Sequence, residues 1–151
     1  MLKDAPVTHI MVLVDGTESA ARAVELGCAL ARVLRVRLTG LAVIEIETLH
    51  QLLSAKVLTE TEMGDFEEAL KESGTRHLEA AVKTARAHGV AMETVLLAGN
   101  SEVIVPREVE KRGVDLVVVG AFDSNEVRFE LLFRQRQQIV DHAPCPALIA
   151  R

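Results

Sequence analysis

The sequence predicts an α/β fold with an open five-stranded parallel sheet and helices on both faces. Short apolar runs such as Ile10–Val14 and Leu116–Val119 end at glycine-containing turns, as buried parallel strands do. Amphipathic helical patterns lie between the runs, and such alternation is typical of strands joined by right-handed crossovers. Aromatic residues make up only 3% of the chain, so the core must consist of Val, Leu, Ile and Ala, which suits buried parallel strands.

The first strand, the first helix and the second strand have the clearest patterns. After Ile10–Val14, either Thr17 or Ser19 is suited to cap a helix. The stretch 18–34 then carries an apolar face of mainly small residues, which permits close packing of a helix on a sheet. The apolar content of 36–44 predicts the second strand.

The middle of the chain is harder to assign. Within 45–63, apolar side chains at helical spacing favour a short helix, and Gly64 predicts a break after it. A long helix is then expected over 65–88, with Gly89 at its C-terminal cap. The third strand is expected over 91–97.

The last third is expected to contain two helices and two strands. Asn100 or Ser101 is suited to cap the first of these helices. Pro106 falls inside that helix, and an interior proline costs roughly 3 kcal/mol, so the helix should start late or kink. The fourth strand is Leu116–Val119, and a helix of undetermined start leads to the final strand, Ala147–Ala150.

Length and composition exclude several classes of protein. The 151 residues predict one domain, 1–151, and the net charge of −5 argues against nucleic acid and anionic membranes as partners. The sequence shows neither a signal peptide nor an apolar run of membrane-spanning length, so we expect a cytoplasmic protein. Cys28 and Cys145 belong to no CxxC pair, and the histidines lack metal-binding spacing, so no disulfide framework or metal site is expected.

Four segments, in their order and spacing, resemble the universal stress protein family. They are Asp15–Ser19, Gly99, Asp115–Gly120 and His142–Pro146, and the last is the most specific signal. The resemblance covers nearly the whole chain. It implies a sheet in the order 3-2-1-4-5, similar to that of the adenine-nucleotide alpha-hydrolases, and a homodimer. Pairing the apolar final strand across a two-fold axis would protect a sheet edge.

One subclass of that family binds ATP through a glycine, two residues, a second glycine, nine residues, and a glycine followed by serine or threonine. Glycines let the backbone approach phosphate, and a helix N-terminus adds partial positive charge. Here Gly120 matches the first position, but Asp123, Phe133 and Arg134 occupy the other three. The chain therefore looks closer to members that lack the motif. The resemblance implies a stress-response accessory or regulatory protein that is not an enzyme and needs no cofactor.

The resemblance also indicates which residues would hold a nucleotide, ATP or AMP, in an altered site. These candidates are Asp15 for the nucleoside, Val43 for the adenine, Gly120 and Ser124 at the same sheet edge, and Arg134 as an anion-binding side chain. Each has a plainer interpretation. Asp15 and Ser124 suit turns, Val43 suits the core, Gly120 suits a turn with positive φ, and Arg134 suits a surface ion pair.

Several alternatives stay open on the sequence alone. The first is a nucleotide-binding switch in which Arg134 or Arg136 faces a phosphate. The second is an enzyme, as a weak nucleotide hydrolase; a Cys145–His142 nucleophile is conceivable, although a buried structural cysteine suits that strand entrance better. The third is a partner-binding module that uses the segment 45–64.

Overall fold

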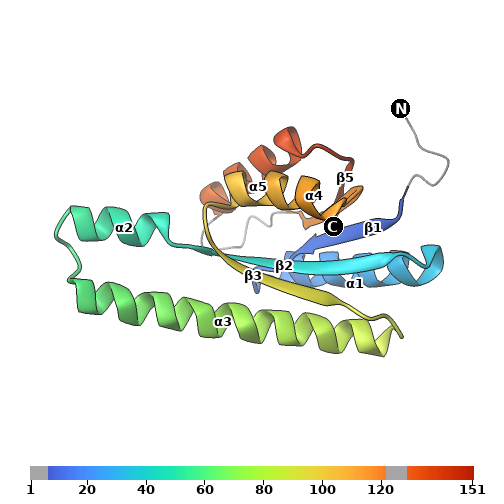
Figure 1. Cartoon of the computed structure of the whole chain (residues 1–151), viewed down its shortest axis with the longest axis horizontal. Coiled ribbons are helices and arrows are strands. Elements are labelled where there is room, and N and C mark those ends of the chain that lie inside the picture. The colour runs from blue at the N-terminus through green and yellow to red at the C-terminus, as the bar shows by residue number, and fades with distance from the viewer. Residues whose placement is uncertain (1–6, 122–128) are drawn as a thin grey trace.

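The computed structural model describes residues 7–121 and 129–151, which form a five-stranded sheet between two layers of helices (Figure 1). The order is β3-β2-β1-β4-β5, and all neighbouring strands pair in parallel, so the predicted fold class is confirmed. The strands are β1 (His9–Leu13), β2 (Arg37–Glu45), β3 (Glu93–Gly99), β4 (Leu116–Gly120) and β5 (Ala147–Ala150). The helices are α1 (Glu18–Leu34), α2 (Glu47–Ser54), α3 (Glu60–Ala87), α4 (Ser101–Arg112) and α5 (Phe129–His142).

The hydrophobic core consists of two layers, one on each face of the sheet. Successive side chains of a strand point to opposite faces. Ile10 and Val12 of β1 accordingly pack with α1 and α3, whereas Met11 packs with α4 and α5. All three side chains are fully buried, which is why β1 forms a continuous apolar run in the sequence.

The predicted break at Gly64 is wrong, because α3 runs without interruption from Glu60 to Ala87. Thr59 caps the helix: its Oγ1 accepts a hydrogen bond from the Glu62 backbone N at 3.2 Å. A single interior glycine costs only about 1 kcal/mol relative to alanine, which a capped helix of this length tolerates.

Of the two alternatives expected for the helix containing Pro106, a late start or a kink, the late start is wrong. Asn100 caps α4 through Oδ1, which accepts from the Glu102 backbone N at 2.8 Å, and Pro106 lies inside the helix. Burial of Val105 and Val109 on either side of the proline holds this segment against the sheet. In the described ranges, no helix is long and apolar enough to cross a membrane.

Changing Gly64 to alanine should raise the free energy of unfolding by about 1 kcal/mol, because alanine is the better helix former. A Cβ added at this position meets no atom within 4 Å, so nothing opposes the gain. Urea unfolding followed by circular dichroism measures it. A loss of stability would mean that Gly64 has a role other than that of a helical residue.

Candidate functional site

The turn after β1 is organised around the carboxylate of Asp15. Asp15 Oδ1 accepts hydrogen bonds from the backbone N of Thr17 at 3.0 Å and from its Oγ1 at 2.6 Å. The same Oγ1 accepts from the backbone N of Ala20 at 3.1 Å, so Thr17, one of the two predicted candidates, caps α1. Gly16 between them has φ +82°, a conformation that glycine adopts without strain.

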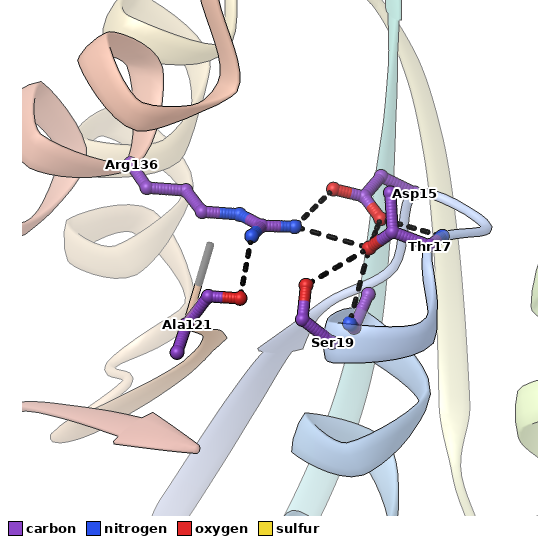
Figure 2. A network of polar contacts seen from close by, with 6 residues as sticks. Asp15, Thr17, Ser19, Ala121 and Arg136 are labelled. Atoms are coloured by element: carbon purple, nitrogen blue, oxygen red, sulfur yellow. Dashed lines mark hydrogen bonds and ion pairs between the residues drawn. The ribbon is translucent and has the colours of Figure 1, made fainter. Parts of the chain in front are cut away.

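Arg136, which comes from α5, reaches across to this turn (Figure 2). Its Nη2 lies 3.0 Å from Asp15 Oδ2 and donates to Thr17 Oγ1 at 3.1 Å, and its Nη1 donates to the Ala121 carbonyl O at 2.9 Å. The Arg136 side chain is 10% exposed and that of Asp15 is 37% exposed. Arg136 therefore ties together the turn after β1, the end of β4 and α5, and both oxygens of Asp15 have partners within the protein.

Gly120 lies where β4 passes the start of α1. A Cβ at this position would stand 2.4 Å from the carbonyl carbon of Ser19 and 2.5 Å from its oxygen. Gly120 is not among the residues with positive φ, so the interpretation of a positive-φ turn is wrong. The glycine is needed instead because two backbone segments approach each other closely.

The other candidate residues lie apart from this network. Val43 is half-buried in β2, opposite Leu97 of β3, and packs against the core layer under α4. Arg134 is exposed on α5. Ser124 lies outside the described residues. The chain departs from the glycine motif at two further positions, Asp123 and Phe133. Asp123 and the side chain of Phe133 also lie outside the described residues.

A second set of contacts, which the sequence did not reveal, lies where β2 ends beside the start of α4. Glu45 Oε1 accepts hydrogen bonds from Ser101 Oγ and, at 3.1 Å, from the Ser101 backbone N. Glu47 Oε2 accepts from Asn100 Nδ2 at 2.9 Å. A helix N-terminus favours negative charge, and here carboxylates of the chain itself supply it. Two features of the sequence signal this contact. Glu45 is an acidic residue at the end of β2, and Asn100 is a cap residue directly after β3.

Cys145 and His142 direct their hydrogen bonds to backbone carbonyls. His142 Nδ1 donates to the Gln138 O at 2.9 Å, and Cys145 Sγ donates to the Pro146 O at 3.5 Å. Burial, and to a lesser extent the charge of Asp115, raise the pKa of Cys145. A reactive cysteine needs a lowered pKa, so this environment opposes a nucleophilic role. No group of three metal-binding side chains occurs in the part of the chain that the structure describes.

Cys145 should react with iodoacetamide more slowly at pH 7 than a free cysteine does, because a raised pKa leaves less thiolate. The rate should continue to rise with pH above the ordinary cysteine pKa of about 8.5, where the rate for a free cysteine levels off. Mass spectrometry after timed alkylation separates Cys145 from Cys28, whose pKa is raised by burial to about 11. Urea-unfolded protein is the control, and rapid alkylation of folded Cys145 at pH 7 would contradict the expectation.

The chain is similar to a known protein family in sequence and to solved structures in fold. The Universal stress protein family matches residues 6–151. A Staphylococcus haemolyticus protein named as a universal stress protein is 30% identical over 146 residues, which are 95% of this chain and 84% of that protein.

Solved structures agree with these sequence matches. Universal stress protein UspA from Lactobacillus plantarum has a TM-score of 0.79 at 20% identity, covering 96% of this chain and 98% of that one. An Arabidopsis thaliana member solved with AMP bound has a TM-score of 0.63 at 22% identity, covering 95% and 90%. The resemblance inferred from the sequence is thus confirmed, and the chain belongs to the universal stress protein family.

Proposed function

We propose that this chain is a stress-response accessory or regulatory protein of the cytoplasm that does not hold ATP in the manner of the glycine-motif subclass. The observation that carries the proposal is the contact between Arg136 and Asp15, 3.0 Å apart at the carboxyl end of β1. Ligands of open α/β sheets sit at this edge. Here the Arg136 side chain already binds the Asp15 carboxylate, which a nucleoside would need to contact.

The energetics of this contact support the proposal. Hydrogen bonds between a guanidinium and a carboxylate are charge-assisted and stronger than neutral ones. A nucleoside that bound Asp15 would have to displace Arg136, whose side chain is only 10% exposed. Leaving a largely buried cation without its partner is costly, so the ligand would have to offset that cost.

The phosphate side of the site supports the same conclusion. Asp123, Phe133 and Arg134 occupy the last three positions of the glycine motif, so the glycines that let a backbone approach phosphate are missing from the sequence there. The carboxylate of Glu45 already engages the N-terminus of α4. A phosphate approaching that helix end would meet a like charge.

The first test is the nucleotide content of the purified protein. Heat denaturation releases bound nucleotide, and ion-exchange chromatography of the supernatant identifies and quantifies it. We expect far less than one adenine nucleotide per chain. A stoichiometric amount of ATP would contradict the proposal.

A second candidate function is a nucleotide switch with an altered phosphate site. The Arabidopsis thaliana structure with AMP bound favours it, because that protein has a similar fold. This candidate predicts that AMP binds more tightly than ATP and that Arg134→Glu weakens AMP binding. Unchanged affinity in Arg134→Glu would count against that geometry. A hydrolase would in addition show ATP turnover that disappears in Asp15→Ala.

We also propose a homodimer formed through β5. This strand is at an edge of the sheet, and Ile149 on it is 50% exposed. An exposed apolar edge strand is a site for pairing with another chain. Light scattering should give the mass of a dimer, and Ile149→Lys should shift it to a monomer. A wild-type monomer at micromolar concentration would contradict the proposal. Nucleic acid and membranes are not proposed as partners.

A further inference from the structure

Part of the molecule extends beyond the sheet as a helical hairpin. This hairpin, called the arm below, comprises α2, the connecting residues 55–59, and residues 60–73 of α3 (Figure 1). The second half of α3 packs on the sheet, where Leu78, Ala81 and Ala85 are buried. The first half of α3 continues past the core, so the side chains exposed on it are available for other contacts.

An apolar stripe runs along the arm. Met63, Phe66 and Leu70 are three and four residues apart and therefore lie on one side of α3. Phe66 is 50% exposed and Leu70 is 38% exposed, although α2 packs nearby. Val57 in the connection is exposed as well. Exposed apolar side chains at helical spacing, rimmed by polar residues, are typical of an interaction surface.

The negative charge of the chain is concentrated in the arm. Residues 47–73 contain seven acidic and two basic side chains, a net charge of −5, which equals that of the whole chain. The remaining residues are thus neutral in sum. Glu62 lies one helical turn before Phe66, and Asp65 and Glu67 flank it, so carboxylates border the stripe on both sides.

We propose that the arm is a docking surface for a cationic amphipathic helix of a partner protein. The apolar side of such a helix fits the stripe, and its lysine or arginine side chains fit the carboxylates at the border. Two arms of this chain would repel each other, since each carries a charge of −5. Anionic lipid would be repelled for the same reason.

A fluorescent synthetic peptide of leucine and lysine, patterned as an amphipathic helix, tests the proposal by fluorescence anisotropy. We expect saturable binding that weakens at least tenfold, about 1.4 kcal/mol, in the double variant Phe66→Ser, Leu70→Ser. The same loss is expected in Glu62→Lys, Asp65→Lys. Raising the salt concentration should weaken binding as well, because exposed charges are screened.

The matched control is Val33→Ser, which removes an apolar side chain that is 78% exposed on α1, outside the arm. This variant should bind the peptide as the wild type does, and a peptide with glutamate in place of lysine should not bind. Circular dichroism establishes that each variant is folded. The proposal is overturned if the arm variants bind the peptide with wild-type affinity or if the wild type shows no saturable binding. It is also overturned if the arm substitutions abolish self-association of the chain instead.

Discussion

Replacing Gly120 with alanine should lower the free energy of unfolding by about 3 kcal/mol, at the upper end of the usual cost of overpacking. The added Cβ would stand 2.4 Å from the carbonyl carbon of Ser19 and 2.5 Å from its oxygen. These are backbone atoms of the first turn of α1, so no side chain can rotate away. Relief requires that α1 move off β4, which would also disturb the Asp15 turn just before the helix.

Gly64→Ala is the matched control, because the same methyl group is added in open space. Urea unfolding of both variants at one pH and temperature compares the two substitutions directly. The two variants should change stability in opposite directions. If Gly120→Ala were as stable as the wild type, the close approach of α1 and β4 in the structure would be wrong.

Replacing Arg136 with methionine should lower the free energy of unfolding by about 2 kcal/mol. Removing one member of a fully buried ion pair costs roughly 3–5 kcal/mol, and the partial exposure of Asp15 reduces that figure here. Methionine keeps much of the apolar stem, so the loss reports mainly on the hydrogen bonds to Asp15, Thr17 and Ala121.

Arg134→Met is the control for this experiment. It removes an exposed arginine from the same helix and should change stability by less than about 0.5 kcal/mol. In the double variant Asp15→Asn, Arg136→Met, the free energy of unfolding should fall by less than the sum of the losses in the two single variants. The reason is that the two residues share one interaction. Equal stability of the Arg136→Met and Arg134→Met variants would contradict the role given to Arg136.

The strands and the start of α1 and α4 could be predicted from local sequence, because their signals are local. For α3 the cap predictions were wrong: Thr59 caps its start, and His88 caps its end one residue before the predicted Gly89. A buried apolar run such as 10–14 and a cap residue such as Thr17 or Asn100 depend on neighbouring residues only. The break at Gly64 and the late start at Pro106 were wrong for a different reason. Glycine and proline weaken a helix by a limited amount, and capping and tertiary packing, which are not visible locally, outweigh that cost.

The location of the candidate site could also be predicted, but its internal contacts could not. Asp15 and Gly120 do lie at the carboxyl edge of the sheet, as parallel topology requires. The choice between Arg134 and Arg136 depends on the rotation of α5, because residues two apart point to different sides of a helix. The role of Gly120 depends on how closely α1 approaches β4, a distance that no sequence pattern specifies.

The central claim is that Arg136 closes the edge of the sheet at Asp15, and we propose that no adenine nucleotide binds there. Titration calorimetry of the nucleotide-free protein with ATP, ADP and AMP tests it most directly. We predict no saturable heat up to about 1 mM ligand, which corresponds to a binding free energy weaker than about −4 kcal/mol. Saturable binding of ATP at micromolar concentration, abolished in Asp15→Ala, would contradict the claim.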